Sequence, residues 1–241
     1  MAVDLGFDEG GSGDTLLVSV QVGVTEQARK FKKQWTRRLG DLVYFHSKDF
    51  NNYTSGVFTK AGLTRPQRQV LLKDLAQLIR SRLFLGIIGK VSKSEYDENT
   101  TQDFRSLHGT AYGFLILMCM LVTYHRVADL EMSPEFNILV EDGHRNSQQV
   151  AQILKKLQLP SGVKILTSGL GSKKDHPILQ ASDMLAYSQW QGVINGDQTI
   201  WTALHRPETV QYRPWVIDCD SEVIQSFVRG NQPKRFLKDA K

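Results

Sequence analysis

The chain has 241 residues, 41% of them hydrophobic, which is enough for one α/β domain with a substantial core. Its 30 Lys and Arg residues outnumber 25 Asp and Glu, so the net charge of +5 favours anionic partners. Two cysteines are too few for a disulfide framework or a thiolate zinc site, and a reducing cytoplasm is therefore expected.

The N-terminus and the longest apolar run argue against export and against a membrane anchor. The first residues are acidic and turn-like, without the basic and apolar regions of a secretory signal. The apolar run 114–122 is much shorter than the roughly 20 residues of a membrane span. We therefore expect a buried core helix there.

The first 24 residues predict a β-hairpin. The runs "MAVDLGFDEG" and "DTLLVSVQVG" are β-prone and are separated by glycines, which places Asp8 and Glu9 at the hairpin tip. Glycines in this turn permit positive φ and the close approach of backbone or ligand to the acids; they are Gly10, Gly11 and Gly13.

The following segment alternates helices with strands. Residues 25–39 predict an amphipathic helix with a basic face, and 41–46 predict a third strand that ends at His46. Thr64 and Gln67 form a capping-box pattern that begins a helix ending near Arg82. The apolar run "LFLGIIGKV" then predicts a buried strand.

The second half continues the alternation. We expect a polar loop over 92–107, an apolar helix over 109–127, and a strand that begins at Phe136 and ends in acids. A helix carrying Val150, Ile153, Leu154 and Leu157 up to Pro160, a strand over 162–169 and a helix over 176–190 follow. Residues 192–241 are weakly patterned and read as a C-terminal extension of a single domain, 1–241. The predicted fold is α/β, with a mixed central sheet and helices on both faces.

Three carboxylates occupy positions that folding alone does not favour. Asp8 and Glu141 end apolar strands, and Asp183 lies on an apolar helix stripe. A carboxylate on an inward stripe costs several kcal/mol unless it is paired or binds a metal. Gathered at one sheet edge, the three acids would suit Mg²⁺ or Mn²⁺, and two such ions about 4 Å apart support phosphodiester hydrolysis.

Four segments carry a resemblance to a known family: "FDEGGSGDTLLVSV", "YFHSKDF", "NILVEDGHRNS" and "DHPILQASDMLAY". Over roughly residues 4–190 the chain resembles domain-of-unknown-function family 3800 (DUF3800). The resemblance implies a ribonuclease-H-like fold with divalent metal held by Asp8, Glu141 and Asp183. This chain departs from the family pattern at Gly11 and Ser182, and its Glu141-Asp142 pair leaves open which of the two is the ligand.

Other residues are candidates for supporting roles at such a site. Glu9 and Asp142 adjoin the proposed ligands, and His46 with Asp49 follows a predicted strand, where an imidazole can act as a base. Lys173 and Lys174 precede the Asp183 helix and could contact phosphate, as could the basic face of 29–38. Each has a plainer alternative: a turn or surface residue, a solvated basic face, or, for Asp183, a buried salt bridge to an arginine.

The leading functional hypothesis is a cytoplasmic, metal-dependent nuclease or phosphodiester-transfer enzyme that acts on DNA or RNA. One alternative is a catalytically silent nucleic-acid-binding or scaffold module of the same fold. An actin-like phosphotransferase is a weaker alternative, because it would need a second glycine-rich phosphate loop and a duplicated domain. A Walker-type loop is also excluded, because Val91 follows Lys90 in "GIIGKVS".

Overall fold

The computed structural model describes residues 1–143, 150, 154, 163–205 and 212–230. Its strands are β1 (Val3–Ser12), β2 (Thr15–Val24), β3 (Leu85–Ser92), β4 (Glu135–Glu141), β5 (Lys164–Gly171) and β6 (Arg213–Asp218). They form one mixed sheet in the order β5-β4-β1-β2-β3-β6. Strands β1, β2 and β3 are antiparallel to their neighbours in this set, whereas β4, β5 and β6 run parallel to β1, β4 and β3 respectively.

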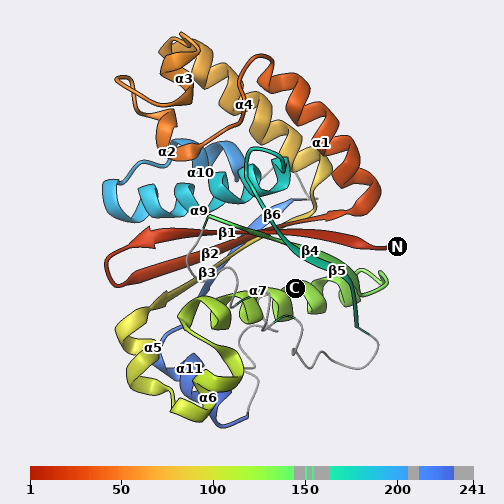
Figure 1. The fold of residues 1–241 in the computed structure, drawn as a ribbon, viewed down its shortest axis with the longest axis vertical. Coiled ribbons are helices and arrows are strands. Elements are labelled where there is room, and N and C mark those ends of the chain that lie inside the picture. The colour runs from red at the N-terminus through yellow and green to blue at the C-terminus, as the bar shows by residue number, and fades with distance from the viewer. Residues whose placement is uncertain (144–149, 151–153, 155–162, 206–211, 231–241) are drawn as a thin grey trace.

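Helices cover both faces of this sheet (Figure 1). One layer holds α1 (Thr25–Leu39), α2 (Ser47–Phe50), α3 (Val57–Lys60), α4 (Arg65–Arg82), α9 (Pro177–Asn195) and α10 (Thr199–Leu204). The opposite layer holds α5 (Lys93–Asn99), α6 (Gln102–His108), α7 (Ala111–Asp129) and α11 (Ser221–Val228). The expected α/β class, with a mixed sheet that opens on an antiparallel hairpin, is confirmed.

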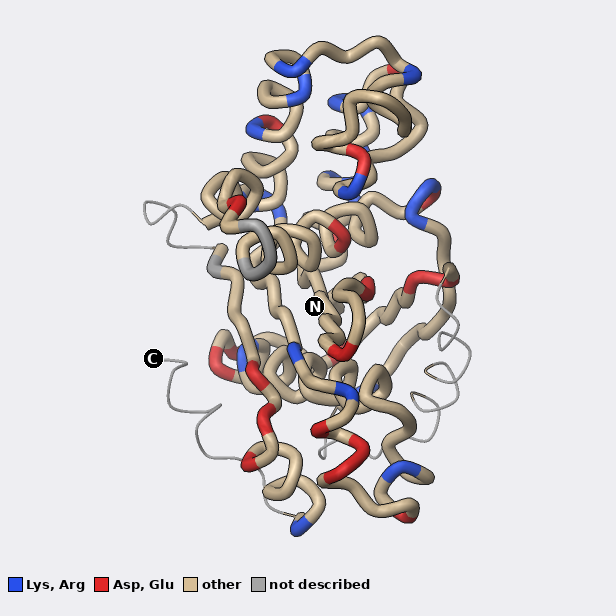
Figure 2. Tube along the Cα trace, turned by 90° about the vertical axis from the view of Figure 1, so that its left-hand side faces the viewer, with Lys and Arg blue, Asp and Glu red and all other residues tan. Residues whose placement is uncertain are grey.

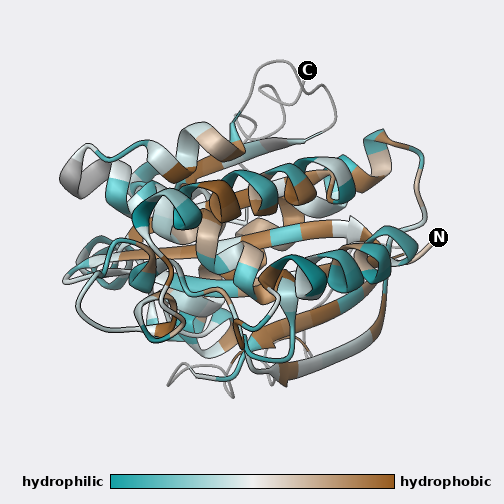
Figure 3. Cartoon of the chain, turned by 90° about the horizontal axis from the view of Figure 1, so that it is seen from above, coloured by the Kyte–Doolittle hydropathy of each residue, from teal (hydrophilic) through white to brown (hydrophobic). Residues whose placement is uncertain are grey.

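Strand β1 shows how the two layers divide the side chains. Val3, Leu5 and Phe7 are buried in the core that includes α7. Successive side chains of a strand point to opposite faces, so Gly6 and Asp8 face the other layer, where α9 packs. Figure 3 shows the same pattern more widely, with apolar segments along the strands and on one side of the helices. Each face of the sheet thus packs against its own layer of helices and contributes apolar side chains to the core.

Helix α7 is the one element in the described part of the chain that is long and apolar enough to cross a membrane. Its side chains from Ala111 to Met120 are all buried, and it packs on β2 and β3. The expected core helix over 109–127 is therefore present. The capping box at Thr64 that begins α4 is also confirmed.

Three local expectations differ from the structure. Asp8 does not lie at the hairpin tip, because β1 continues to Ser12 and the turn falls at Gly13 and Asp14. Residues 41–46 form no strand, because Leu42 and Phe45 pack among helices instead of joining the sheet and Val43 is exposed. The expected loop over 92–107 contains α5 and α6, each begun by a capping hydroxyl, from Ser92 and Thr101.

The described parts of the C-terminal segment, 192–205 and 212–230, also hold more regular structure than their sequence pattern suggests. Strand β6 adds to the sheet beside β3, and Tyr212, Ile217 and Val223 are buried. The C-terminal segment is therefore partly built into the main sheet instead of simply extending from it. Of the helix expected before Pro160, only Val150 and Leu154 lie within the described residues, and both are helical and buried.

Candidate active site

Asp8 and Glu141 lie at equivalent positions on neighbouring parallel strands. Strands β1 and β4 pair in register up to Phe7 opposite Val140, and the two acids are the next residues along each strand. Asp8 is fully buried, whereas the Glu141 side chain is 20% exposed. Parallel pairing therefore brings together two carboxylates that are 133 positions apart.

Helix α9 adds Asp183 to this pair because it packs closely on β1 and β2. The hydroxyl of Ser182 donates to the carbonyl of Gly6 over 2.6 Å, and the hydroxyl of Ser19 donates to the carbonyl of Ser182 over 2.7 Å. Gly6 also leaves room for the helix, since a Cβ there would lie 2.8 Å from Cγ2 of Ile178. Ser182 thus ties the helix to the sheet.

The ammonium of Lys173 lies among the three carboxylates. Its Nζ is 2.9 Å from Oδ1 of Asp183, 3.1 Å from Oδ2 of Asp8 and 3.6 Å from Oε1 of Glu141. The Lys173 side chain is 14% exposed and comes from the loop between β5 and α9. The alternative given for Asp183, a buried salt bridge with a structural role, is therefore present in the structure. Its partner is a lysine and not the expected arginine.

The electrostatics of the cluster are unbalanced. Burial raises the pKa of Asp8 well above its ordinary value, and the charge of Asp183 raises it further, against the opposing effect of Lys173. Burial by itself lowers the pKa of Lys173, but Asp183, Asp8 and Glu141 outweigh it and raise that pKa above the ordinary lysine value. When all three acids are ionised, one ammonium leaves the cluster with an excess of two negative charges.

Two contacts hold Asp183 and Lys173 in place from outside the cluster. The backbone N–H of Ser47 donates to Oδ2 of Asp183 over 2.7 Å. Gln180 accepts from the Trp35 indole and the Phe45 backbone N–H, each at 2.8 Å, and donates to the Lys173 carbonyl over 2.6 Å. Gln180 thus joins α1, the loop before α2 and the lysine loop around the same site.

The remaining candidates lie around the cluster rather than in it. His46 precedes Ser47, and its Nδ1 is 3.3 Å from Oδ2 of Asp49. Glu9 faces the α7 side of the sheet, where burial first and then its charge raise the pKa of Tyr112. Asp142 is exposed, and its backbone N–H donates to the carbonyl of Gly171. Of the Glu141-Asp142 pair, Glu141 is the residue whose carboxylate reaches Lys173.

Lys174 and the helices near it are basic. Lys174 is exposed, and its ammonium lies 5.9 Å from the centre of the Tyr44 ring. Residues 25–82 contain thirteen Lys or Arg against four Asp or Glu. In Figure 2, Lys and Arg predominate in the layer of α1 and α4, whereas Asp and Glu are more frequent near the sheet and in the opposite layer. The charge of the molecule is therefore unevenly distributed.

The carboxylate cluster suits a hard divalent cation by its donor chemistry. All three side chains offer oxygens, and within the described residues the ion pair of Oδ2 with Lys173 is the one polar contact found for the buried carboxylate of Asp8. No group of three or more acidic, His or Cys side chains there is arranged ready for a metal, because the acids surround the Lys173 ammonium. A divalent ion therefore fits this donor set only if the lysine withdraws.

Sequence reasoning missed the parts played by Lys173, Ser47 and Gln180. Gln180 and Asp183 share the apolar segment "LQASD", so a second polar residue on that stripe was a usable signal. The lysine carried no such signal, because nothing in its sequence context shows that the β5–α9 loop folds over the acids. The Ser47 contact is made by backbone and is invisible in sequence.

Comparison with known proteins assigns neither a family nor a function to the chain. No protein-family model matches the chain, and no curated protein matches it significantly.

Proposed function

We propose that the protein is a divalent-metal-dependent nuclease or related phosphodiester-transfer enzyme that acts on nucleic acid. The observation that carries this proposal is the convergence of Asp8, Glu141 and Asp183, from three distant segments, on one cation position. A fold gains little from burying three acids around one lysine, since such clusters are seldom more stable than an apolar core. A functional role explains why the acids are there.

The topology supports a ribonuclease-H-like fold of the DUF3800 type. A three-stranded antiparallel meander is extended beside β1 by two parallel strands, and the proposed site lies on the first strand, a later parallel strand and a late helix. Strand β6 then adds to the β3 edge. This placement agrees with the positions that the sequence resemblance assigned to Asp8, Glu141 and Asp183.

Mg²⁺ or Mn²⁺ would be held by Asp8, Glu141 and Asp183. When bound, such an ion supplies an activated water and stabilises negative charge on the leaving oxygen. The Ser47 N–H keeps Asp183 oriented through Oδ2, which leaves Oδ1 directed at the centre of the cluster. Lys173, once it leaves the acids, has the flexible stem and the charge to contact a phosphate.

Nucleic acid as the partner is supported by the basic layer. Arg29, Lys32, Lys33 and Arg37 are exposed on α1, and no described carboxylate lies within ion-pair distance of them. Cations that no carboxylate neutralises are available to contact the phosphates of a nucleic acid bound at the proposed site. The two buried, free cysteines fit the reducing cytoplasm that we propose as the location.

The alternative is a catalytically silent nucleic-acid-binding module, and Lys173 is the observation in its favour. Because the ammonium already partly neutralises the acids, the cluster can persist without metal. Crystals grown in chelator and soaked in Mn²⁺ test the two functions directly. The nuclease proposal requires anomalous density among the three carboxylates with the Lys173 ammonium moved away. The silent module is the better account if the lysine stays and no density forms.

A further inference from the structure

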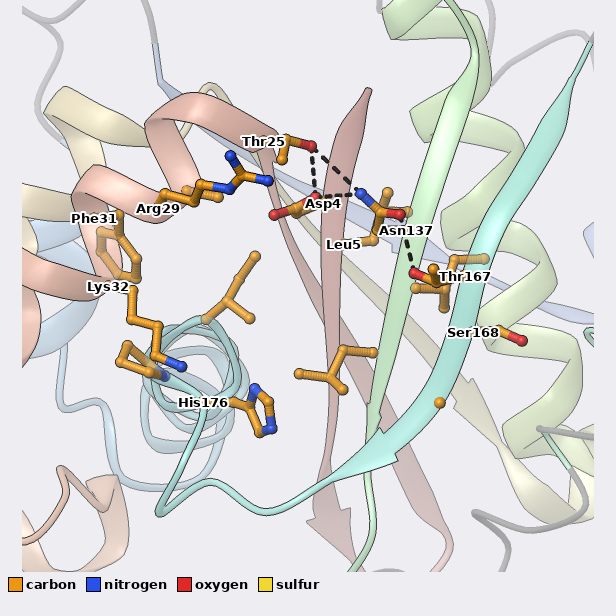
Figure 4. Close-up of a pocket in the computed structure, with 16 residues that line it drawn as sticks. Asp4, Leu5, Thr25, Arg29, Phe31, Lys32, Asn137, Thr167, Ser168 and His176 are labelled. Carbon is orange, nitrogen blue, oxygen red and sulfur yellow. Dashed lines mark hydrogen bonds between the residues drawn. The ribbon is translucent and has the colours of Figure 1, made fainter. Parts of the chain in front are cut away.

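A cavity separate from the carboxylate cluster lies on the same side of the sheet. It has a volume of about 440 Å³ and is bounded by α1, the beginning of α9, and strands β1, β4 and β5 (Figure 4). This size is within the usual range of small-molecule sites. The cavity shares no lining residue with the acids that contact Lys173, so it is a separate feature of the molecule.

The cations of α1 differ in whether an acid neutralises them. Lys30 pairs with Glu26 at 2.6 Å, and Arg38 pairs with Asp74 at 2.9 Å. Arg29 and Lys32 line the cavity, and within the described part of the chain no carboxylate reaches ion-pair distance of either. Two of the unneutralised cations of α1 therefore line the cavity, whereas the two neutralised ones, Lys30 and Arg38, lie outside its lining.

His176 places a second nitrogen-bearing side chain beside Lys32 in the lining of the cavity. Figure 4 shows its imidazole and the Lys32 ammonium on the same side of the cavity, next to the start of α9. Burial lowers the pKa of His176, and the charge of Lys32 lowers it further, as expected for two groups close together. Gly171 leaves room for the imidazole ring of His176, since a Cβ at this position would lie 2.8 Å from Cδ2 of His176.

The one acid that lines the cavity is already committed to other partners. Oδ1 of Asp4 accepts hydrogen bonds from the Thr25 hydroxyl at 2.7 Å and from the Asn137 amide at 2.8 Å. These contacts lie at the end of the cavity away from His176 (Figure 4). At the end with Lys32 and His176 no described lining residue is a carboxylate, and Asp175 and Asp142, which raise the pKa of His176, lie outside the lining.

The cavity also has an apolar wall that a simple inorganic anion would not need. Leu139 and Ile178 line it and are only half-buried, and the exposed Ser168 of the edge strand β5 lies at its opposite side. Cationic groups at one end and apolar surface beyond them suit a ligand that carries an anion on a ring-containing body. Among such ligands, a nucleotide matches the anionic partner that the charge of this layer favours.

We propose that this cavity binds a nucleotide, with its phosphate at Lys32 and His176 and its nucleoside against Leu139 and Ile178, toward the end where Arg29 lies. The inference goes beyond the proposed nuclease activity and does not require the carboxylates to bind metal. The nucleotide has two sources: a free nucleotide, or one unit of a strand that continues to the cluster. The second is geometrically open, because the loop from Ser172 to His176 joins both sites and carries Lys173.

Calorimetric titration of the full chain in EDTA tests the proposal with three probes: adenosine 5′-monophosphate, adenosine and single-stranded oligothymidylate. We expect the monophosphate to bind at least about tenfold more tightly than adenosine, because only it has the phosphate. The double variant Arg29→Gln/Lys32→Gln should lose about tenfold in affinity. Lys30→Gln/Arg38→Gln removes the same charge from the same helix outside the cavity and should lose less than about twofold.

The probes also identify the source. Binding of the monophosphate but not of oligothymidylate indicates a free nucleotide, whereas oligothymidylate that the monophosphate displaces indicates a strand subsite. The proposal is overturned if neither probe binds, if adenosine binds as well as its phosphate, or if both double variants weaken binding equally. Because chelator is present throughout, none of these outcomes depends on metal, and a failure here leaves the nuclease proposal to its own test.

Discussion

The Lys173 ammonium donates to Oδ1 of Asp183 over 2.9 Å, while the Ser47 backbone N–H donates to Oδ2 of the same carboxylate over 2.7 Å. The two contacts differ in kind, because one comes from the backbone and the other from a long, flexible side chain. A competing cation can replace the lysine without disturbing the backbone contact. Asp183 is thus oriented in advance for whichever cation occupies the cluster.

Substitution of Lys173 measures how far the acids depend on their counter-ion. Lys173→Met should lower the free energy of unfolding by about 3–5 kcal/mol in EDTA, because it leaves buried carboxylates without a partner. Mn²⁺ should restore part of that stability, since it can take the vacated position. Urea unfolding with and without Mn²⁺ measures both effects. The exposed neighbour is the control, and Lys174→Met should change stability by less than about 0.5 kcal/mol.

Asp183→Asn tests ligation separately from packing, because it keeps the shape of the side chain and removes its charge. We expect Mg²⁺ or Mn²⁺ to raise the melting temperature of the wild type, and the variant to lose most of that response together with cleavage of DNA or RNA. Asp103→Asn, on the exposed side of α6, should behave as the wild type does. Cleavage that survives Asp183→Asn would refute the proposed site.

The sheet and most of its elements could be predicted because their signals are local. The apolar runs of β1, β2 and β3 and the capping box of α4 are encoded in adjacent residues. Residues 41–46 misled the prediction because Leu42 and Phe45 pack on helices instead of in the sheet. Strand β6 was missed because its pairing with β3 joins segments about 130 residues apart.

The site was predictable only in its acidic half. Asp8 and Asp183 violate local hydrophobic patterns, and such violations are visible in sequence. The ion pairs of Lys173 and of Arg38 depend on which loops and helices meet in space, and no local pattern carries that information. The sequence therefore indicated that charges were buried without indicating what neutralises them.

The pKa of Asp8 predicts the pH dependence of the metal-free protein. Burial raises that pKa well above its ordinary value, so over the interval between the two values the folded state holds a proton that the unfolded state has lost. Stability should therefore fall as pH rises through this interval, and Asp8→Asn should flatten the fall. Urea unfolding in EDTA at a series of pH values measures both slopes.

Asp14 in the same hairpin provides a control of opposite sign. Hydrogen bonds from Ser92 and Ser94 lower its pKa, so its contribution to stability is present above the ordinary value and is lost as pH falls below it. Asp14→Asn should leave the fall at higher pH intact. Equal slopes for the wild type and Asp8→Asn would mean that Asp8 does not control this dependence.

Gly6 controls the distance between α9 and the sheet. A Cβ at this position would meet Cγ2 of Ile178 at 2.8 Å and the Ile178 backbone carbon at 3.2 Å, so Gly6→Ala must push the helix outward. We expect a decrease of about 1–3 kcal/mol in unfolding free energy and weaker binding of Mn²⁺, because Asp183 moves with α9. Gly169→Ala meets nothing within 4 Å and should be nearly neutral. Equal effects of the two changes would show that close packing of α9 does not position the acid.

The basic face of α1 contains two kinds of cation, and their difference predicts which ones contact nucleic acid. Lys33 and Arg37 are exposed, lie one helical turn apart and have no carboxylate within ion-pair distance among the described residues. Lys30 and Arg38 already pair with Glu26 and Asp74. A phosphate gains less from a cation that must first give up its own carboxylate.

Lys33→Gln/Arg37→Gln should therefore weaken binding of a single-stranded oligonucleotide more than Lys30→Gln/Arg38→Gln does, although both remove two charges from one helix. Each phosphate that a variant no longer neutralises should make the slope of log affinity against log salt shallower by about 0.7. Fluorescence anisotropy at several salt concentrations measures the slope, and metal-induced stabilisation should persist in both variants. If the two pairs change the slope equally, binding responds to the overall charge of the helix, and the unpaired cations have no special role in holding the strand.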